Sequence, residues 1–190
     1  MELLAGVFSA FGLSASAGLN AYIPLLVVAL TARYSDLIKL NPPWDVLTSG
    51  WIIGLLVVLL VIELFADKVP AVNHANDLIQ TFIRPVAGAI LFAANAQVIS
   101  DIHPVLAMAA GLLIAGGVHA VKSVAVRPVV TATTGGVGNL AVSTTEDVAA
   151  TIISIMAILI PIAMILIALI IFVWIVIRIR SKRNNAQSVN

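Results

Sequence analysis

The charged residues of the chain divide it into long apolar stretches. A helix needs roughly 20 residues to cross a hydrocarbon core about 30 Å thick. The stretches therefore predict an all-α integral membrane protein with about six hydrophobic crossings or re-entrant segments. Six runs contain no Asp, Glu, Lys or Arg, namely 3–32, 46–62, 85–100, 102–121, 128–145 and 148–177.

The first run holds 30 residues, which is more than one upright crossing needs. Its centre is crowded with residues that weaken a helix, among them Gly12, Gly18, Asn20 and Pro24. Such residues are tolerated at membrane depth only where protein or a cavity satisfies the backbone. We therefore predict a broken or re-entrant helix within 3–32.

The stretch 131–139 is uncharged but poor in large apolar residues. It has three glycines within four positions, which disfavours a continuous helix. Arg127 stands directly before Pro128, and a residue before proline is biased away from the helical conformation. We expect a helix to end near Arg127 and 131–139 to form a loop or unwound segment held inside the protein.

Two pairs of short segments resemble one another. Residues 83–89 (Ile-Arg-Pro-Val-Ala-Gly-Ala) match 126–132 (Val-Arg-Pro-Val-Val-Thr-Ala), and 17–21 resemble 116–120. Three crossings in each half would relate the halves by inversion, as in many transporters. The two matches use different offsets, so a 3+3 inverted repeat with broken helices and the absence of a repeat both stay open.

Composition supports a lipid environment. Hydrophobic residues make up 61% of the chain and charged residues 10%, against roughly a quarter charged in an ordinary soluble domain. Too few charges are present to cover a soluble surface, so the lipid bilayer is the expected partner. The formal net charge of +1 gives no indication of nucleic acid.

The basic residues cluster at the end of the sequence. Arg178, Arg180, Lys182 and Arg183 follow the last apolar run, so residues 1–178 are predicted as one transmembrane domain and 179–190 as a disordered basic tail. The positive-inside rule makes this tail cytoplasmic. Six crossings then place the N-terminus and 63–84 on the cytoplasmic side of a bacterial inner membrane and 33–45 on the external side.

One group of polar residues lies between the second and third runs. Glu63 and Asp67 are four residues apart and share a helical face. Downstream, His74, Asp77, Thr81 and Arg84 follow at spacings of three, four and three, which forms a polar stripe on an amphipathic helix. The stripe fits either a helix at the cytoplasmic interface or the lining of a pathway.

A second polar group flanks the glycine-rich stretch. Ahead of it stand His119, Lys122, Ser123 and Arg127, and Asn139, Glu146 and Asp147 follow. Free amides of a Gly-rich turn beside Arg and Lys form an anion nest suited to phosphate. Alternatively, Lys122 and Arg127 pair with Glu146 and Asp147 and only neutralise one another.

The sequence lacks the features of an enzyme. Without cysteine, it has no structural disulfide, thiolate metal site or cysteine nucleophile. No nucleophile-and-base pair or metal-ligand motif stands out. We therefore expect no catalytic residue, no bound metal and no cofactor, with a homodimer as one possible assembly.

Three sequence motifs resemble those of a known family. Ser16-Ala-Gly-Leu-Asn-Ala-Tyr22, Glu63-Leu-Phe-Ala-Asp-Lys-Val-Pro70 and His119-Ala-Val-Lys-Ser123, continued by 127–136, resemble small multi-pass membrane proteins described as a domain of unknown function, of the 4126 type. The resemblance reaches from the first run to Asp147. It implies a membrane fold and no particular activity.

Transport of a small anion or phosphate-bearing molecule, such as a lipid headgroup, is the leading functional hypothesis. Two alternatives are a cation/proton exchanger that uses the carboxylates and a structural membrane protein that transports nothing. The expected substrate-binding residues are Asn20, Arg84, His119, Lys122, Ser123, Arg127, Thr131, Thr133, Thr134, Gly135, Gly136 and Asn139. The expected proton- or ion-coupling residues are Glu63, Asp67, Asp77, Glu146 and Asp147.

Overall fold

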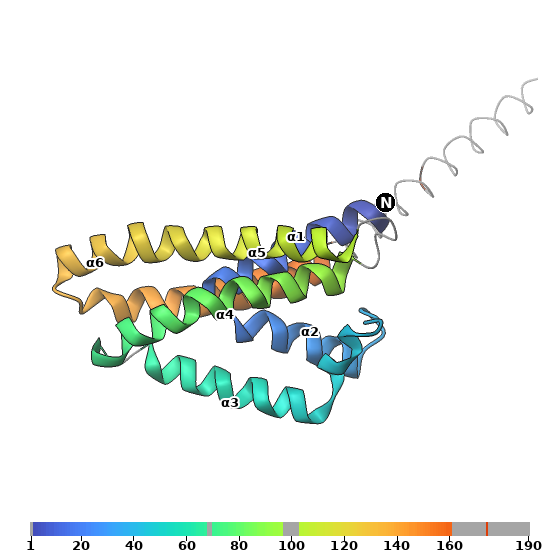
Figure 1. The fold of residues 1–190 in the computed structure, drawn as a ribbon, viewed down its shortest axis with the longest axis horizontal. Helices are drawn as coiled ribbons and strands as arrows, with labels where there is room; N and C mark the ends of the chain where they lie inside the picture. The colour runs from blue at the N-terminus through green and yellow to red at the C-terminus, as the bar shows by residue number, and fades with distance from the viewer. Residues whose placement is uncertain (1, 68–69, 97–102, 161–173, 175–190) are drawn as a thin grey trace, which may run out of the picture.

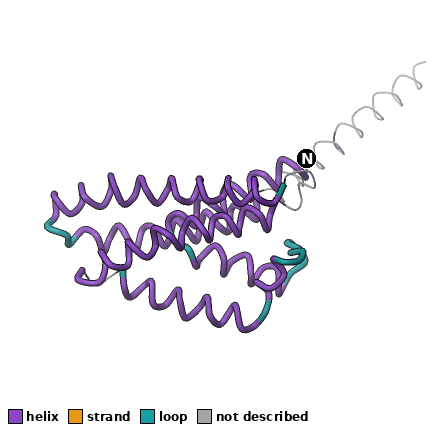
Figure 2. The backbone as a smooth tube through the Cα atoms, in the orientation of Figure 1, coloured by secondary structure: helices purple, strands orange, loops and turns teal. Residues whose placement is uncertain are grey.

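The computed structural model describes residues 2–67, 70–96, 103–160 and 174. Throughout this part of the chain the elements are helices joined by loops, and they form an elongated bundle (Figure 2). The labelled elements are α1 (Glu2–Leu19), α2 (Tyr22–Tyr34), η1 (Trp44–Thr48), α3 (Gly50–Ala66), α4 (Pro70–Ala96), α5 (Pro104–Val121), η2 (Lys122–Val126) and α6 (Arg127–Thr134). A further helix, which we call the 138–160 helix, follows α6.

The first two helices form a hairpin. α1 runs toward the middle of the bundle and ends beside Asn20, and α2 turns back toward the end where α1 began (Figure 1). The side-chain oxygen of Asn20 accepts hydrogen bonds from the backbone N–H groups of Tyr22 (3.0 Å) and Ile23 (3.1 Å). This bonding satisfies N–H groups at the start of α2, so the predicted break within 3–32 is confirmed.

The hairpin changes the expected arrangement of the loops. Trp44, which follows α2, packs against a buried cluster that includes Ala10 of α1 and Ala107 of α5. The connection between α2 and α3 therefore lies at the same end of the molecule as the beginning of α1 (Figure 1). The two segments share this end because the chain doubles back at Asn20, and the membrane sides predicted for 33–45 and the N-terminus stay a prediction.

α4 carries the polar stripe predicted after Glu63. Residues 70–84 form the first half of this continuous helix, as the amphipathic pattern predicts, and Pro85 lies inside it. The apolar side chains of Leu78, Ile79 and Phe82 are exposed, whereas Arg84 is fully buried. Of the predicted stripe, Arg84 is buried, Asp77 is half-buried and Thr81 is exposed, so the polar face turns inward toward its Arg84 end.

α5, η2 and α6 follow one another as a single helical path of 31 residues, Pro104–Thr134. η2 is a π-helical segment, and the backbone N–H of Arg127 donates to the carbonyl of Lys122 five residues earlier. This wider turn accommodates Pro128, which has no N–H to donate. The helix therefore continues past Arg127, where the sequence predicts its end.

The glycine-rich stretch is a turn at the tip of the bundle. Thr131 to Thr134 belong to α6, and Gly135 and Gly136 have positive φ angles of 62° and 92°. Most of the stretch is exposed rather than held inside the protein. Run 128–145 accordingly forms the end of one helix and the start of the next, not a crossing of its own.

Within the described residues, three helices are long and apolar enough to cross a membrane: Asn76–Asn95, Pro104–Thr134 and the 138–160 helix. Their outer surfaces carry exposed large apolar side chains such as Phe82, Leu113 and Ile152. The predicted lipid-facing helix is described as far as Ile160, and the basic tail 179–190 lies outside the described residues.

The expected repeat pairs lie in different backbone settings. Pro85 is inside the uninterrupted helix α4, whereas Pro128 follows the π-helical segment η2. Asn20 lies where α1 stops, whereas His119 is in the last turn of α5. The local matches therefore do not extend to matching helix breaks, and the inverted repeat stays a prediction.

Candidate functional site

A buried charge network lies where the hairpin tip meets α3, α4, α5 and the 138–160 helix. Its innermost pair joins Arg84 of α4 to Glu63 of α3, with 2.8 Å between Nη2 and Oε1. Asp67 lies one turn after Glu63, and its Oδ2 is 3.9 Å from the same Arg84 nitrogen. Glu63 and Asp67 therefore share a face, as their spacing predicts.

Asp67 connects four helical segments. Its Oδ2 is 3.5 Å from Nη2 of Arg127 and accepts a hydrogen bond of 3.2 Å from Ser143 Oγ. Its other oxygen accepts a hydrogen bond of 2.6 Å from the side-chain amide of Asn76. Both Arg-Pro elements, Arg84-Pro85 and Arg127-Pro128, thus direct their arginines to this carboxyl group.

The other basic side chains are also paired with carboxyl groups. Arg127 lies 2.5 Å from Asp77, and Lys122 lies 2.5 Å from Glu146. Arg127 is in addition 3.8 Å from Glu146. Mutual neutralisation, one of the two alternatives left by the sequence, is therefore seen for Lys122 and Arg127 with Glu146.

Asp147 contacts the hairpin tip. Its Oδ1 accepts a hydrogen bond of 3.0 Å from the side-chain amide of Asn20. The side-chain oxygen of the same Asn20 caps α2. This one side chain therefore holds the turn between α1 and α2 and also joins the hairpin to the 138–160 helix. The sequence predicts a role for each of these residues but not their contact with one another.

His119 is held between α4 and the network. Nδ1 lies 3.4 Å from Nη1 of Arg84, and Nε2 lies 3.1 Å from the hydroxyl of Thr81. Arginine can only donate, so Nδ1 of His119 accepts the hydrogen bond from Arg84. The ring hydrogen is then on Nε2, which donates a hydrogen bond to the Thr81 hydroxyl. The Thr81 hydroxyl in turn donates to the backbone carbonyl of Asp77 (2.8 Å).

The end of α1 supplies backbone oxygens to the network. Nη1 of Arg84 donates to the carbonyl of Gly18 (3.5 Å), and Nζ of Lys122 donates to the carbonyl of Leu19 (3.3 Å). The last carbonyls of a helix have no intrahelical partner and carry partial negative charge, which stabilises nearby cations. The helix break at Asn20 thus coincides with a helix end that binds cationic side chains.

Carboxyl groups outnumber cations in the described part of this network. Three basic side chains, Arg84, Lys122 and Arg127, face five carboxyl groups. Two atoms of the innermost pair, Oε2 of Glu63 and Nε of Arg84, are buried without a hydrogen-bond partner among the described residues. Buried polar atoms are normally satisfied, so such atoms are candidates for a proton, water or ligand. The five carboxyl groups are those of Glu63, Asp67, Asp77, Glu146 and Asp147.

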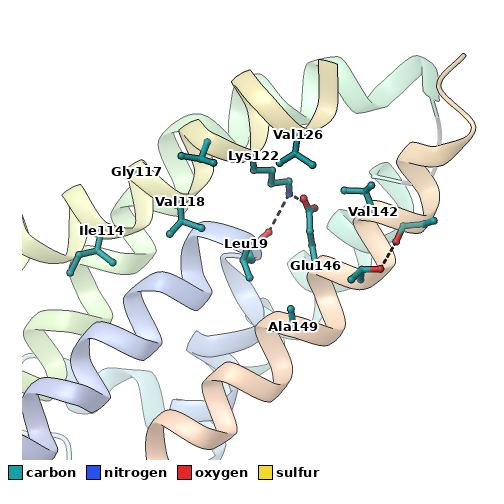
Figure 3. A pocket seen from close by; sticks show the side chains of 12 residues that line it. Leu19, Ile114, Gly117, Val118, Lys122, Val126, Val142, Glu146 and Ala149 are labelled. Atoms are coloured by element: carbon teal, nitrogen blue, oxygen red, sulfur yellow. Dashed lines mark hydrogen bonds and ion pairs between the residues drawn. The ribbon is translucent and has the colours of Figure 1, made fainter. Parts of the chain in front are cut away.

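An apolar groove reaches the network from one side. It has a volume of about 810 Å³ and lies between α5–η2 and the 138–160 helix. Figure 3 shows Lys122 and Glu146 meeting in this groove, with Lys122 also directed to Leu19. The rest of the wall is mainly aliphatic, with Thr145 as a further polar residue.

Several predicted substrate-binding residues lie apart from the network. Thr131 accepts a hydrogen bond from the side chain of Asn139 (2.9 Å), and Ser123 donates to the carbonyl of Ala120 in its own helix. The continuous helix through Arg127 carries the glycine-rich turn to the tip of the bundle (Figure 1). The residues concerned are Ser123, Thr131, Thr133, Thr134, Gly135, Gly136 and Asn139.

Asn76, Gln80 and Ser143 are buried polar residues of the site region that are not among the predicted site residues. Asn76 and Gln80 precede Arg84 at intervals of four, and Ser143 precedes Asp147 by four. These helical spacings were available in the sequence as a signal. The side chain of His74, the first residue of the predicted stripe, lies outside the described residues.

Among the described residues, no group of three or more His, Asp or Glu side chains is arranged to hold a metal ion.

Comparison with protein families finds a model that matches residues 7–182, described as a domain of unknown function (DUF4126). No curated protein and no solved structure matches the chain.

Proposed function

We propose that this chain, which belongs to the DUF4126 family, is a membrane transporter that exchanges a cation for protons at its buried charge network. The observation that carries the proposal is the excess of carboxyl groups over basic side chains among the described residues of the network. Glu63, Asp67 and Glu146 are buried, and Asp77 and Asp147 are half-buried. A surplus of carboxyl groups in a site of low polarity is neutralised either by a proton or by a bound cation. Alternation between these two states is the chemistry of an exchanger.

Glu63 is the best candidate for the exchanging group. One of its two oxygens is bonded to Arg84, and the other is buried with no hydrogen-bond partner among the described residues. A structural ion pair at this depth would be more stable with both oxygens bonded. Oε2 of Glu63 can therefore take up a proton without breaking the contact between Arg84 and Oε1.

The re-entrant hairpin supports a transport role. A helix that ends within the bundle exposes backbone carbonyls, and here these bind Arg84 and Lys122. Non-helical backbone at membrane depth is tolerated where it is enclosed by protein or lines a cavity. Discontinuous helices whose ends meet charged groups are a common construction of ion-coupled transporters.

Anion transport receives less support from the same contacts. Each of the basic side chains is within ion-pair distance of a carboxyl group, namely Arg84, Lys122 and Arg127. An anion would have to displace these carboxyl groups before it could bind. The glycine-rich turn, whose amides the anion hypothesis needs beside these cations, is exposed at the tip of the bundle.

The basic tail and the hairpin together support one orientation in the membrane. Arg178, Arg180, Lys182 and Arg183 favour a cytoplasmic C-terminal side. The hairpin adds no crossing, whereas α3, α4, α5–α6 and the 138–160 helix each run along the bundle (Figure 1). Four crossings keep both termini cytoplasmic and move the connection between α2 and α3 to the cytoplasmic side as well.

Reconstitution tests the proposal directly. Proteoliposomes with an internal pH-sensitive dye are given gradients of inorganic and organic cations, with chloride and phosphate gradients for comparison. We expect cation-driven proton movement that falls by roughly tenfold or more in Glu63→Gln, the scale of a lost charged group in a binding site. Asp36→Asn, which removes an exposed carboxyl group between α2 and α3, should leave the flux intact.

Two results would overturn the proposal. Phosphate or chloride flux that needs Arg127, with no cation-driven proton movement, would assign anion transport instead. Stable, well-folded protein that carries no flux under any gradient would assign a structural role, in which the network only joins the helices.

A further inference from the structure

The apolar groove beside the charge network has the character of a ligand site. Its walls come from Leu19 at the hairpin tip, Val118 and Val126 on the α5–η2 side, and Val142 and Ala149 on the 138–160 helix. Glu146 and Lys122 are nearly buried and stand together in this wall (Figure 3). An aliphatic surface that ends at a buried charge pair suits a molecule with an apolar body and one polar group.

We infer that this groove binds a lipophilic organic cation, with the apolar body between α5–η2 and the 138–160 helix and the positive charge beside Glu146. The inference rests on the proposed function and names the class of cation that is exchanged for protons.

The size and chemistry of the groove favour an organic cation over an inorganic one. Its volume of about 810 Å³ falls within the range of roughly 300–1,000 Å³ that holds drug-sized molecules. An inorganic ion needs several oxygen ligands around it, and no group of three acidic or histidine side chains is arranged for that among the described residues. The aliphatic walls instead gain from the burial of an apolar body.

Charge complementarity decides the sign of the ligand. Glu146 belongs to the network in which, among the described residues, five carboxyl groups face three basic side chains. An added cation reduces this imbalance, and an added anion increases it. Lys122 keeps a second acceptor, the carbonyl of Leu19 at 3.3 Å, when Glu146 turns toward a ligand. Arg127 likewise keeps Asp77 as its partner.

Exchange then balances in charge. The protonated network binds one organic cation and releases one proton, so the cation replaces the proton as the group that neutralises the surplus carboxyl. No bond other than O–H is broken, and the proton leaves to the aqueous phase.

Two probes of nearly the same shape and opposite charge test the inference. Binding of tetraphenylphosphonium and of tetraphenylborate to the full-length purified protein in detergent is measured by equilibrium dialysis, and proton release is followed in weakly buffered solution. We expect the phosphonium to bind and to release protons, and the borate to bind at least about tenfold more weakly, as expected for a buried charge of the wrong sign.

Two variants locate the site. Glu146→Gln removes the charge and should weaken phosphonium binding by about tenfold or more. Gly117→Leu should do the same by filling the groove, because Gly117 lines it and an added Cβ meets no atom within 4 Å. Gly54→Leu on α3, where an added Cβ also meets nothing within 4 Å, is the matched control and should bind normally.

The outcomes separate this inference from the proposed function. Equal binding of both probes, or binding unchanged by Gly117→Leu, overturns the inference and indicates a groove filled by lipid acyl chains without charge selection. If the inference fails in this way but small inorganic cations still drive proton movement in liposomes, the proposed cation/proton exchange stands without an organic-cation site in the groove. Phosphonium binding that needs Glu146 but releases no proton contradicts the proposed exchange and, with it, the exchange assigned to this groove.

Discussion

Arg84 and Glu63 form an ion pair of 2.8 Å in which neither side chain reaches the surface. The pair joins the last turns of α3 to the middle of α4. Removal of one partner leaves a buried charge uncompensated, whereas removal of both leaves two neutral polar groups.

Arg84→Gln should therefore lower the free energy of unfolding by about 3–5 kcal/mol. The double variant Glu63→Gln/Arg84→Gln should be more stable than Arg84→Gln, since the two introduced amides are neutral and can bond to each other. Denaturant unfolding in detergent measures both, with Lys39→Gln in an exposed position as the control. A double variant less stable than Arg84→Gln would show that the pair is not the reason for the loss.

Gly88 and Gly111 bring α4 and α5 into close contact. A Cβ added at Gly88 would lie 2.7 Å from the carbonyl oxygen of Gly111, and backbone cannot move away as a side chain does. Gly88→Ala should therefore destabilise the protein by about 1–3 kcal/mol, the usual effect of overpacking. Gly116→Ala, whose Cβ would meet only Pro85 at 3.5 Å, is the control and should be neutral or stabilising in the same unfolding assay.

Asn20→Ala should destabilise the hairpin tip. The change removes the cap of α2 and the hydrogen bond to Asp147, and loss of a cap alone lowers stability by about 0.5–2 kcal/mol. Ser49→Ala, which removes only a single 3.3 Å capping bond at the start of α3, should have the smaller effect. The two variants are compared by thermal unfolding, and an equal loss in both would argue against the second role of Asn20.

The proposed arrangement, in which the hairpin adds no crossing, predicts which positions face the same side of the membrane. The chain has no cysteine, so single cysteines introduced at Glu2, Asp36 and Val137 can be labelled without background. In sealed vesicles a membrane-impermeant maleimide should reach positions 2 and 36 from one side and position 137 from the other. Labelling of positions 2 and 36 from opposite sides would instead show that 3–32 crosses the membrane once.

The sequence predicts the broken first helix and the helical polar stripe for physical reasons that are local. Asn20 stands where helix-weakening residues gather, and Asp77, Thr81 and Arg84 follow a helical period. Each signal depends on neighbours within a few turns, so it needs no knowledge of tertiary contacts.

The parts that could not be predicted depend on contacts across the bundle or on alternatives of similar energy. Nothing local to Asp67 indicates that Arg127, 60 residues later, will reach it. The π-helical turn at Lys122–Val126 lets the helix pass Pro128, whereas the residue pair Arg127-Pro128 alone favours an end. Because the helix continues, the glycine-rich turn moves to the tip of the bundle.

The polar contacts of the hairpin have a consequence for the order in which the protein is made. Ser16 forms hydrogen bonds with Ala150 and Ser154, and Asn20 forms one with Asp147. These partners are synthesised 127 to 138 residues after Ser16 and Asn20. Until the 138–160 helix has emerged from the ribosome and entered the bilayer, the hydroxyl of Ser16 and the amide of Asn20 lack these acceptors. The hairpin is therefore expected to reach its final position late in biosynthesis, and a chain truncated before residue 147 should leave 2–34 accessible to protease.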